Sequence, residues 1–582
     1  MRKTKIVCTI GPASAQEDIL KQIMLSGMDV ARLNFSHGTL ESQKKLSDTV
    51  KKLRDELHLP IALMLDTKGP EIRIGEFSTP EIELKTNDKF TLTTRRITGT
   101  DKIVSVTFQK LPAEVRPGSK ILIDDGLIEL TVDSCTDTDV LCTVANGGVI
   151  SARKSVNVPG IRLSLPFISE KDREDIAFGV RENFDLIAAS FTRDADDIIE
   201  LRTELEKNGC HNMKIISKIE NSDGVKNIDE IIRVSDGIMV ARGDLGVEIP
   251  LEDIPGIQKK IIKKVANAGK VVITATQMLD SMIKNPRPTR AETTDVANAI
   301  YDGTSAIMLS GETASGLYPV QAVKMMAKIA ERTERDINYR ERFERRDFKE
   351  QPNVTSAISH ATCTTAHDLG AAAIITVTKS GRTARMISKY RPDCPIISGT
   401  TDWTVLRQMN LSWGVTPILV EEKDNTDELF DHVVHVAREH NLVHDGDLVV
   451  ITAGVPLGIS GTTNLLKVQL VGDVQVSGAG ITKGRTCGNL CVCKNEAEAR
   501  EKFKDGDILV IPETSNAILQ IIRKSSGLIT ERSGLNSHAA IVGLALDKPV
   551  IVGAHNATRI LKSGTTVTLD ASRGIVYSGA HS

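Results

Sequence analysis

The segment IISKIEN, residues 215–221, places a lysine and a glutamate inside an apolar run. Its isoleucines are typical of a buried strand, and the two-residue period of a strand puts Lys218 and Glu220 on the same face. One hypothesis is an edge strand whose solvent-exposed face carries an ion pair. The other is a site in which an ammonium and a carboxylate point at one ligand.

Apolar runs of strand length recur through the first 315 residues, and each is followed by a stretch of helical length. The runs are KIVCTIG, DVARLNFS, IALMLDTKG, FDLIAASF, KIISKIEN, GIMVARGD, VVITATQ and SAIMLSGE. Strands this uniformly apolar are buried on both faces, as parallel strands covered by helices are. Eight such units predict a closed (β/α)8 barrel, which carries its chemistry at the carboxyl ends of the strands.

Polar residues fall at those carboxyl ends. They are Arg32, Asn34, Ser36, Asp66, Lys68, Ser190, Lys218, Glu220, Asp244, Thr276 and Glu312. A solvent-exposed face would not be so regular, so Lys218 and Glu220 are expected to point into the barrel mouth. Glu220 ends one strand and Asp244 the next, and two carboxylates at one rim are typical of a magnesium or manganese site. A structural salt bridge is the alternative, but it would not need the glycines 243 and 246 beside Asp244.

Lys218 beside a divalent cation would add positive charge where a phosphoryl group or an enolate develops negative charge. Arg32 and Arg73 could grip phosphate oxygens in a forked geometry. These residues indicate a phosphorylated, anionic substrate. An aldolase that forms a Schiff base at Lys218 is a rival, although Glu220 should keep that lysine protonated and poorly nucleophilic.

A second polar set is rich in oxygen ligands and carries one full charge. It consists of Asn34, Ser36, Asp66 and Thr67. Such a set suits a monovalent cation better than a divalent one. Ordinary capping of turns is the alternative reading.

Several domains are expected, because 582 residues exceed what one core normally fills. Residues 1–69 and 167–336 are assigned to the barrel. Residues 70–166 contain short alternating segments and Asp-Gly and Gly-Gly turns, which predict a small all-β lid inserted in a barrel loop. Residues 337–472 are assigned to a further α/β domain and residues 473–582 to a last domain.

Composition argues against several classes of partner. A net charge of -3 gives no reason to expect nucleic acid or an acidic membrane. No apolar run of about 18 residues and no cleavage pattern is found, so we expect a soluble, unexported, cytoplasmic protein. Nine scattered cysteines fit a reduced compartment. The C-x3-C-x-C cluster at Cys487, Cys491 and Cys493 has poor spacing for zinc.

Residues 1 to 472 resemble the pyruvate kinase family. The resemblance rests on ordered motifs: KTKIVCTIGPAS, ARLNFSHG, LDTKGPEIR, IISKIENSDGV, MVARGDLGVE, TATQMLDSM, NPRPTRAETTDVANAI and IMLSGETASGLYP. It implies transfer of the phosphoryl group of phosphoenolpyruvate (PEP) to ADP, giving pyruvate and ATP in glycolysis, with Mg2+ (or Mn2+) and K+ as cofactors. It also implies a homotetramer regulated by an effector.

The resemblance assigns roles to matching positions. Lys218, Arg32, Arg73 and Thr276 would be catalytic, with Thr276 at the face where the enolate is protonated. Mg2+ would be bound by Glu220 and Asp244, and K+ by Asn34, Ser36, Asp66 and the Thr67 carbonyl. The substrate would be bound by Arg32, Lys218, Gly243, Asp244 and Thr276. The nucleotide would be bound by Asn34, His37, Arg73 and Lys154. K+ activation is predicted because members that require K+ carry Glu at the position of Glu71.

The resemblance also implies that TKSGRT, residues 378–383, and GISGTTN, residues 458–464, form an effector pocket for a phosphorylated sugar or nucleotide. Its phosphate would be held by Thr378, Lys379, Ser380, Arg382 and Thr383. From the residues alone, hydroxyls and cations before a helix form a phosphate cradle, or a plain N-cap turn.

The segment SGLNSHA, residues 533–539, resembles the phosphohistidine segment of PEP-utilising enzymes, whose pattern is Gly-Gly-x-Thr-Ser-His-Ala. His538 is retained, but Ser533 replaces the first Gly and Asn536 replaces the Thr. A structural, oligomer-bracing or regulatory role is expected for this last domain, which resembles the mobile domain of PEP-utilising enzymes, because the barrel already contains the groups for direct transfer to ADP. The alternatives are a PEP synthase or dikinase that uses His538 as a phosphoryl carrier, and a metabolite sensor built on an inactive barrel.

Overall fold

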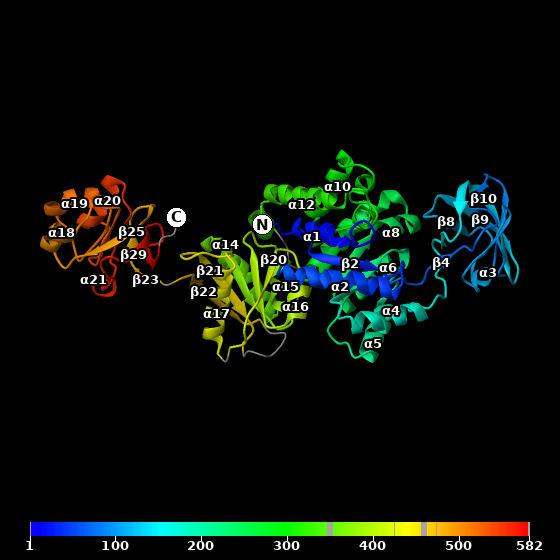
Figure 1. Ribbon diagram of the computed structural model, residues 1–582, viewed down its shortest axis with the longest axis horizontal. Helices are drawn as coiled ribbons and strands as arrows, with labels where there is room; N and C mark the ends of the chain where they lie inside the picture. The colour runs from blue at the N-terminus through cyan, green and yellow to red at the C-terminus, as the bar shows by residue number, and fades with distance from the viewer. Residues whose placement is uncertain (1, 346–352, 424, 456–462, 473, 580–582) are drawn as a thin grey trace. The chain divides into compact units, whose positions relative to one another are not determined.

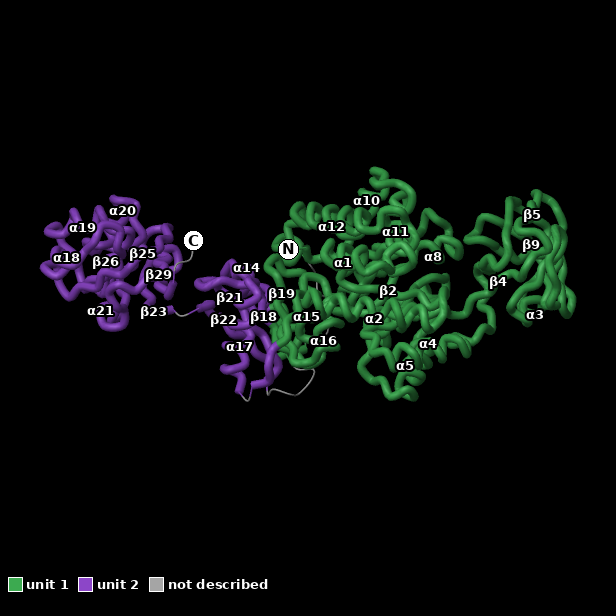
Figure 2. Tube along the Cα trace, in the orientation of Figure 1, with its two compact units in different colours: residues 1–360, 376–419, 458–463 green, residues 361–375, 420–457, 464–582 purple. Residues whose placement is uncertain are grey.

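The computed structural model describes residues 2–345, 353–423, 425–455, 463–472 and 474–579 (Figure 1). The chain divides into two compact units (Figure 2). Residues 1–360, 376–419 and 458–463 form unit 1, and residues 361–375, 420–457 and 464–582 form unit 2. Among the described helices, none combines the length and hydropathy of a membrane span.

All eight apolar runs are strands of one closed barrel in unit 1, as predicted. The strands are β1 (Lys5–Thr9), β2 (Val30–Asn34), β3 (Ala62–Asp66), β13 (Leu186–Ala189), β14 (Lys214–Ile219), β15 (Gly237–Ala241), β16 (Val271–Ala275) and β17 (Ala306–Leu309). Their order is β1-β17-β16-β15-β14-β13-β3-β2, and each neighbouring pair is parallel. All eight carboxyl ends therefore meet at one rim.

Two layers of core follow from the two-residue period of the strands. Alternate strand residues form one buried cluster within the barrel; they include Val7, Met64, Ile216, Met239 and Ile273. The residues between them, such as Ile6, Leu63 and Ile215, pack in a second cluster against the surrounding helices. Because both faces are covered, the strands can be apolar throughout.

Helices follow the strands and cover the barrel. They are α1 (Glu17–Leu25), α2 (Leu40–Glu56), α4 (Glu170–Arg181), α5 (Ala195–Lys207), α7 (Ile228–Val234), α9 (Ile254–Asn267), α10 (Arg290–Asp302) and α12 (Pro319–Asp336). Capping boxes at Thr39, Ser169 and Thr289 start α2, α4 and α10. Short helices α6 (Ser222–Lys226), α8 (Arg242–Glu248) and α11 (Gly311–Ala314) lie directly above strand ends.

The inserted lid is all-β apart from the short helix α3 (Leu111–Glu114), as predicted. Its main sheet has the order β4 (Ile72–Arg73), β12 (Ser155–Asn157), β8 (Lys120–Ile123), β9 (Ile128–Cys135), β10 (Asp139–Asn146), β6 (Lys89–Thr93) and β7 (Ile103–Ser105). A second pair joins β5 (Glu81–Leu84) to β11 (Gly148–Ser151). The hairpin between β8 and β9 turns through Asp124, Asp125 and Gly126, which all have positive φ.

The α/β region after the barrel is divided between the units. After α13 (Tyr339–Glu344), helix α14 (Val354–Leu369) and strand β18 (Ala373–Val377) cross the boundary. Unit 1 contains α15 (Arg382–Lys389), α16 (Trp403–Met409) and the parallel pair β19 (Ile396–Thr400) and β20 (Val415–Leu419). Unit 2 contains α17 (Thr426–Glu439) and the antiparallel pair β21 (Leu448–Ala453) and β22 (Leu465–Leu470).

The last segment forms a mixed sheet in unit 2. Its order is β23 (Val474–Ser477), β30 (Ile575–Ser578), β29 (Thr566–Asp570), β25 (Arg485–Val492), β26 (Ile508–Ile511), β27 (Gly527–Thr530), β28 (Val550–Val552) and β24 (Ala479–Gly480). The helices are α18 (Glu496–Lys502), α19 (Leu519–Lys524), α20 (His538–Leu546) and α21 (Ala557–Ile560). Separate buried clusters on the two faces of the sheet show that it has its own core.

Candidate functional site

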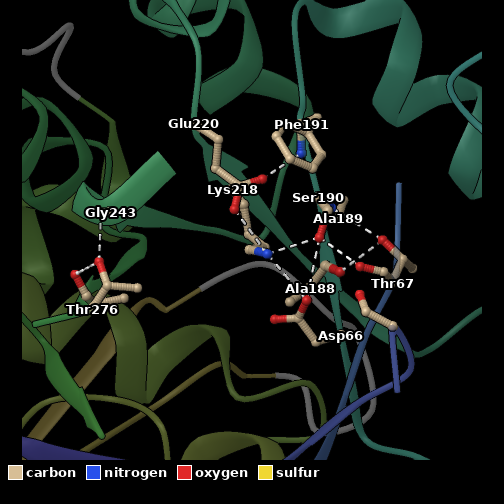
Figure 3. A network of polar contacts seen from close by, with 12 residues as sticks. Asp66, Thr67, Ala188, Ala189, Ser190, Phe191, Lys218, Glu220, Gly243 and Thr276 are labelled. Atoms are coloured by element: carbon tan, nitrogen blue, oxygen red, sulfur yellow. Dashed lines mark hydrogen bonds and ion pairs between the residues drawn. The ribbon is translucent and has the colours of Figure 1, made fainter. Parts of the chain in front are cut away.

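The centre of the barrel rim is the ammonium of Lys218 on β14 (Figure 3). Its Nζ lies 2.9 Å from Glu220 Oε1, 3.1 Å from Asp66 Oδ1 and 2.8 Å from Ser190 Oγ. An ammonium has three hydrogens, so these partners can use all of them. Lys218 and Glu220 therefore point at one place inside the rim, and the edge-strand alternative is wrong.

Opposite charges keep Lys218 and Asp66 ionised in this buried cluster. Burial disfavours the charged form of Lys218, but the carboxylates of Asp66 and Glu220 outweigh it and raise the pKa of the lysine. Burial likewise opposes ionisation of Asp66, yet the guanidinium of Arg32 and the ammonium of Lys218 hold its pKa below the usual range. A protonated Lys218 is a poor nucleophile, which argues against the Schiff-base alternative.

Arg32 is held on the other side of Asp66. Its Nε donates to Asp66 Oδ2 at 2.6 Å, and its Nη1 donates to Thr9 Oγ1 at 2.8 Å. Arg32 is 8% exposed, so its guanidinium is fixed within the rim rather than extended into solvent. Asp66 thus orients the two cations, Arg32 and Lys218, toward one region.

Glu220 is almost fully buried just beyond the end of β14. Its Oε2 accepts the backbone N–H of Phe191 at 2.6 Å, while Oε1 faces Lys218. Burial raises the pKa of Glu220 to about 7, and the nearby carboxylate of Asp244 adds to the shift, whereas Lys218 opposes it. Excess negative charge at Glu220 and Asp244 is what a divalent cation would neutralise.

Asp244 and Thr276 lie beyond their strands. β15 ends at Ala241, and Asp244 is in the first turn of α8, so this carboxylate lies about one helical turn beyond the strand end on which it was expected. Thr276 follows β16 with a φ of 65°, the left-handed region. Its Oγ1 accepts the N–H of Gly243 at 2.8 Å, and its carbonyl accepts from Arg242 at 2.8 Å, which ties the two loops together.

The four residues of the second polar set lie at the ends of β2 and β3. Asn34 and Asp66 are register partners on these strands. Asn34 Oδ1 accepts the N–H of Ser36 at 3.0 Å, and the Thr67 carbonyl accepts the hydroxyl of Ser190 at 2.6 Å. Of this set, Asp66 contacts Lys218 directly and the Thr67 carbonyl is connected to it through Ser190, while Asn34 and Ser36 contact each other at the end of β2.

Residues expected to contact nucleotide come from different elements. Arg73 lies in β4 of the lid, where its guanidinium binds both carboxylate oxygens of Glu71, at 2.6 and 2.9 Å. Lys154 is next to β12, which pairs with β4, and its Nζ lies 2.8 Å from Asp124. His37 is exposed on the loop after β2. The structure thus groups Arg73 with Lys154, and His37 belongs to the barrel.

A cleft runs between the lid and the barrel rim. It is lined on the lid side by residues of β4, β12 and the chain that follows β12, and on the barrel side by residues that include Phe191, Arg193, Asp244 and Glu248. Burial raises the pKa of Glu248, to which Asn157 of the lid is hydrogen bonded. The rim therefore opens into a space that both domains border.

The residues expected to hold an effector phosphate surround the start of α15 in unit 1. Gly381 has a φ of 73°, and the helix begins at Arg382, whose side chain is exposed. Thr383 Oγ1 lies 3.0 Å from Thr463 Oγ1. The rest of that second loop, residues 458–462, lies outside the described residues.

His538 begins α20 at the wall of a polar cavity in unit 2. Its Nδ1 lies 2.9 Å from Thr514 Oγ1 and its Nε2 lies 3.0 Å from Asn516 Oδ1. An amide oxygen only accepts, so Nε2 would be the donor in this contact. Arg532, which also lines the cavity, is paired with Glu513.

Sequence reasoning missed part of this site. Ser190 stood among the polar residues at strand ends without a role, and Phe191 and Thr9 were not singled out. Phe191 contributes its backbone N–H, which no residue type reveals. Thr9 ends the first barrel strand, so its position was the available signal.

The fold and rim define a (β/α)8-barrel enzyme with an inserted lid, and comparisons name its family. The family model "Pyruvate kinase, barrel domain" matches residues 1–323, "Pyruvate kinase, alpha/beta domain" matches residues 356–469, and "PEP-utilising enzyme, mobile domain" matches residues 503–574. The match to the barrel domain covers more than half of the chain. The chain belongs to the pyruvate kinase family.

Relatives and solved structures agree. A pyruvate kinase of Sporosarcina psychrophila is 49% identical, with 100% of this chain and 99% of the relative covered. A pyruvate kinase of Geobacillus stearothermophilus is 50% identical, with 99% of each covered. The crystal structure of a pyruvate kinase from Cryptosporidium parvum matches with a TM-score of 0.77 and 41% identity, over 81% of this chain and 96% of that one. The reaction is therefore phosphoryl transfer from PEP to ADP, which gives pyruvate and ATP.

Proposed function

We propose that the rim around Lys218 is the active site at which the phosphoryl group leaves PEP. The observation that carries this proposal is the contact of one buried ammonium with both Glu220 and Asp66. Lys218 would neutralise charge on the transferring group and on the enolate that remains. Arg32, oriented by the same Asp66, would hold phosphate oxygens from the other side.

Glu220 and Asp244 would hold Mg2+ or Mn2+. The donor set fits such an ion, because two carboxylates lie close enough for one to raise the pKa of the other. When bound, the ion supplies Lewis-acid stabilisation of phosphoryl and enolate oxygens. Gly243, whose N–H is fixed by Thr276, leaves room for substrate to approach the backbone.

Thr276 would face the enolate carbon that takes up a proton. Its hydroxyl donates to the Ala275 carbonyl at 2.6 Å and accepts from Gly243, so its position is fixed before substrate arrives. The nucleotide would be bound by Asn34 and His37 of the barrel and by Arg73 and Lys154 of the lid. Closure of the lid would exclude water from the transferring group.

Asn34, Ser36, Asp66 and the Thr67 carbonyl would bind K+. The placement of Asn34 and Asp66 side by side in register at the ends of β2 and β3 supports this assignment. Glu71, bound to Arg73, is the residue that predicts K+ activation. We further propose a cytoplasmic homotetramer whose effector, a phosphorylated sugar or nucleotide, binds at Thr378, Lys379, Ser380, Arg382 and Thr383.

His538 is assigned no part in the main reaction. His538 lies within the segment that matches the mobile domain of PEP-utilising enzymes. However, its Nε2 contacts Asn516, and the barrel rim already contains groups for direct transfer. A PEP synthase or dikinase is not favoured, because the relatives with full coverage are pyruvate kinases.

The test is formation of pyruvate and ATP from PEP and ADP with Mg2+, with and without K+. Lys218→Met should lower kcat by about 100-fold or more, because a charge at the transferring group is lost. Lys214→Met is the matched control: it lies on the same strand but at the amino end, beside Asp236, and should keep wild-type turnover. Equal rates for K218M and wild type would overturn the assignment of the active site to Lys218. Rates that do not depend on K+ would overturn the assignment of the monovalent-cation site.

A further inference from the structure

Ser190 lies between the two proposed ion sites. It follows the last residue of β13, which stands between β3 and β14 in the barrel, and it is 2% exposed. β3 ends at Asp66 and β14 carries Lys218. The serine is therefore placed by the barrel between a proposed K+ ligand and the proposed catalytic ammonium (Figure 3).

The backbone fixes Ser190 in this position. Its N–H donates to Thr67 Oγ1 at 3.1 Å, and the Thr67 N–H donates to the Ala188 carbonyl at 3.1 Å. Gly69 packs so closely that a Cβ there would lie 2.9 Å from Ser190 Cβ. The hydroxyl therefore has little freedom to turn away from its partners.

The hydroxyl links the two sites through hydrogen bonds. Ser190 Oγ accepts from Lys218 Nζ at 2.8 Å. Its single hydrogen can point to the Thr67 carbonyl at 2.6 Å or to Asp66 Oδ1 at 3.2 Å. Both of these acceptors belong to the proposed K+ set, so a cation bound there would change which of them the hydroxyl hydrogen favours and how the lone pair faces Lys218.

Phe191, the residue after Ser190, fixes Glu220 through its backbone N–H. Phe191 has a φ of 55°, a region that an aromatic residue rarely occupies, and in this conformation its N–H reaches Glu220 Oε2 at 2.6 Å. Two consecutive residues thus hold the ammonium and the carboxylate of the Lys218–Glu220 pair. Strained backbone at this turn is maintained by its surroundings, which favours a functional role.

We propose that Ser190 is a positioning residue that couples occupancy of the monovalent-cation set to the placement of the Lys218 ammonium. The inference rests on the proposed roles of Lys218, Asp66 and the Thr67 carbonyl. An ordinary buried serine would satisfy its hydroxyl with local backbone, as Thr192 does by donating to the Ala189 carbonyl at 3.0 Å. Ser190 instead contacts residues far apart in the sequence.

The test compares Ser190→Ala with Thr192→Val in the full-length protein. Thr192 is the matched control because it is equally buried, two residues away, and its hydroxyl bonds only with backbone among the contacts described. The first readout needs no turnover: calorimetric binding of oxalate, a planar dianion shaped like the enolate, with Mg2+ in either K+ or tetramethylammonium buffer. The second readout is kcat and KM for PEP as functions of K+ concentration.

In wild type and T192V, K+ should tighten oxalate binding, and S190A should lose most of that gain. The K+ concentration for half-activation should rise roughly tenfold or more in S190A, because a hydrogen bond to a charged group is lost. S190A that keeps the wild-type K+ gain in both readouts would overturn the coupling. A wild-type protein without any K+ gain would instead overturn the monovalent-cation set itself, and the coupling with it.

Discussion

At the scale of single residues, the ammonium of Lys218 already has a protein partner for each of its hydrogens. The three hydrogens of Lys218 are matched by Asp66, Ser190 and Glu220, so a phosphoryl oxygen must replace one of them. Glu220 is the partner best suited to leave, because a cation between Glu220 and Asp244 would take over its charge. Binding of the divalent ion and release of Lys218 are therefore expected to be linked.

The pKa of Glu220 makes divalent-ion binding depend on pH near neutrality. Burial raises this pKa to about 7. A proton and a metal compete for the carboxylate, so Mn2+ affinity should be constant above about pH 8 and fall by up to about tenfold per unit below pH 7. Mn2+ titrations followed by electron paramagnetic resonance from pH 6 to 8 measure this.

The control for this experiment is Glu248→Gln. Burial also raises the pKa of Glu248, and the residue borders the same cleft, but it is not in the proposed ligand set. E248Q should keep the pH dependence, and Glu220→Gln should bind Mn2+ weakly at every pH. An affinity for Mn2+ that is unchanged from pH 8 to 6 in wild type would contradict the prediction.

At the scale of elements, the site depends on the turn that leads from β3 into the lid. Gly69 has a φ of 70°, its N–H donates to Asp172 at 3.2 Å, and it packs against Ser190 and Phe191. The lid strand β4 begins three residues later. The same glycine therefore connects the lid to the turn that holds Lys218 and Glu220.

Gly69→Ala should affect both stability and turnover. A side chain at positive φ costs about 1 kcal/mol, and the close contact with Ser190 should add about 1–3 kcal/mol. Gly209→Ala isolates the first term, since Gly209 also has positive φ but has no neighbour within 4 Å of the added Cβ. The midpoint temperature of thermal unfolding and kcat should both fall further in G69A than in G209A. Equal effects of the two substitutions would show that crowding at Gly69 is unimportant.

At the scale of the whole molecule, the last segment has its own core but also packs within unit 2. A Cβ on Gly446 would lie 2.7 Å from the ring of Tyr577, so this tyrosine covers the loop before β21. Gly446 also donates its N–H to the Val471 carbonyl at 2.8 Å. The segment after Val471 therefore contributes packing to the α/β region, while the reaction is assigned to unit 1.

A chain that ends at Val471 should keep turnover within about threefold of the full chain, because a domain with its own core can be removed without loss of the others. Its thermal stability should fall, since the contact with Tyr577 is lost. The assay is pyruvate formation together with the oligomeric state in solution. His538→Ala in the full chain is the companion variant and should leave turnover unchanged. Loss of activity in a truncation that stays folded and keeps the oligomeric state of the full chain would give the last segment a catalytic role.

Much of this protein could be predicted from local pattern. The eight barrel strands, the all-β insertion and the rim position of Lys218 and Glu220 follow from hydrophobic period and from polar residues at strand ends, which are local properties of the chain. Asp244 was placed on a strand end but lies one helical turn further, because the short helix α8 has too few residues to show a period.

Residue types and their order along the chain thus determined the barrel, its chemistry-bearing end and the family to which it belongs. Only the tertiary structure decided that Asp66, Ser190 and Lys218 meet, because β3 and β13 pair across the whole inserted lid. It also decided that the Phe191 N–H reaches Glu220, since a backbone donor and a positive φ leave no mark on residue type. Contacts between distant segments come from parallel strand pairing and packing, and neither can be inferred from the local hydrophobic period of the sequence.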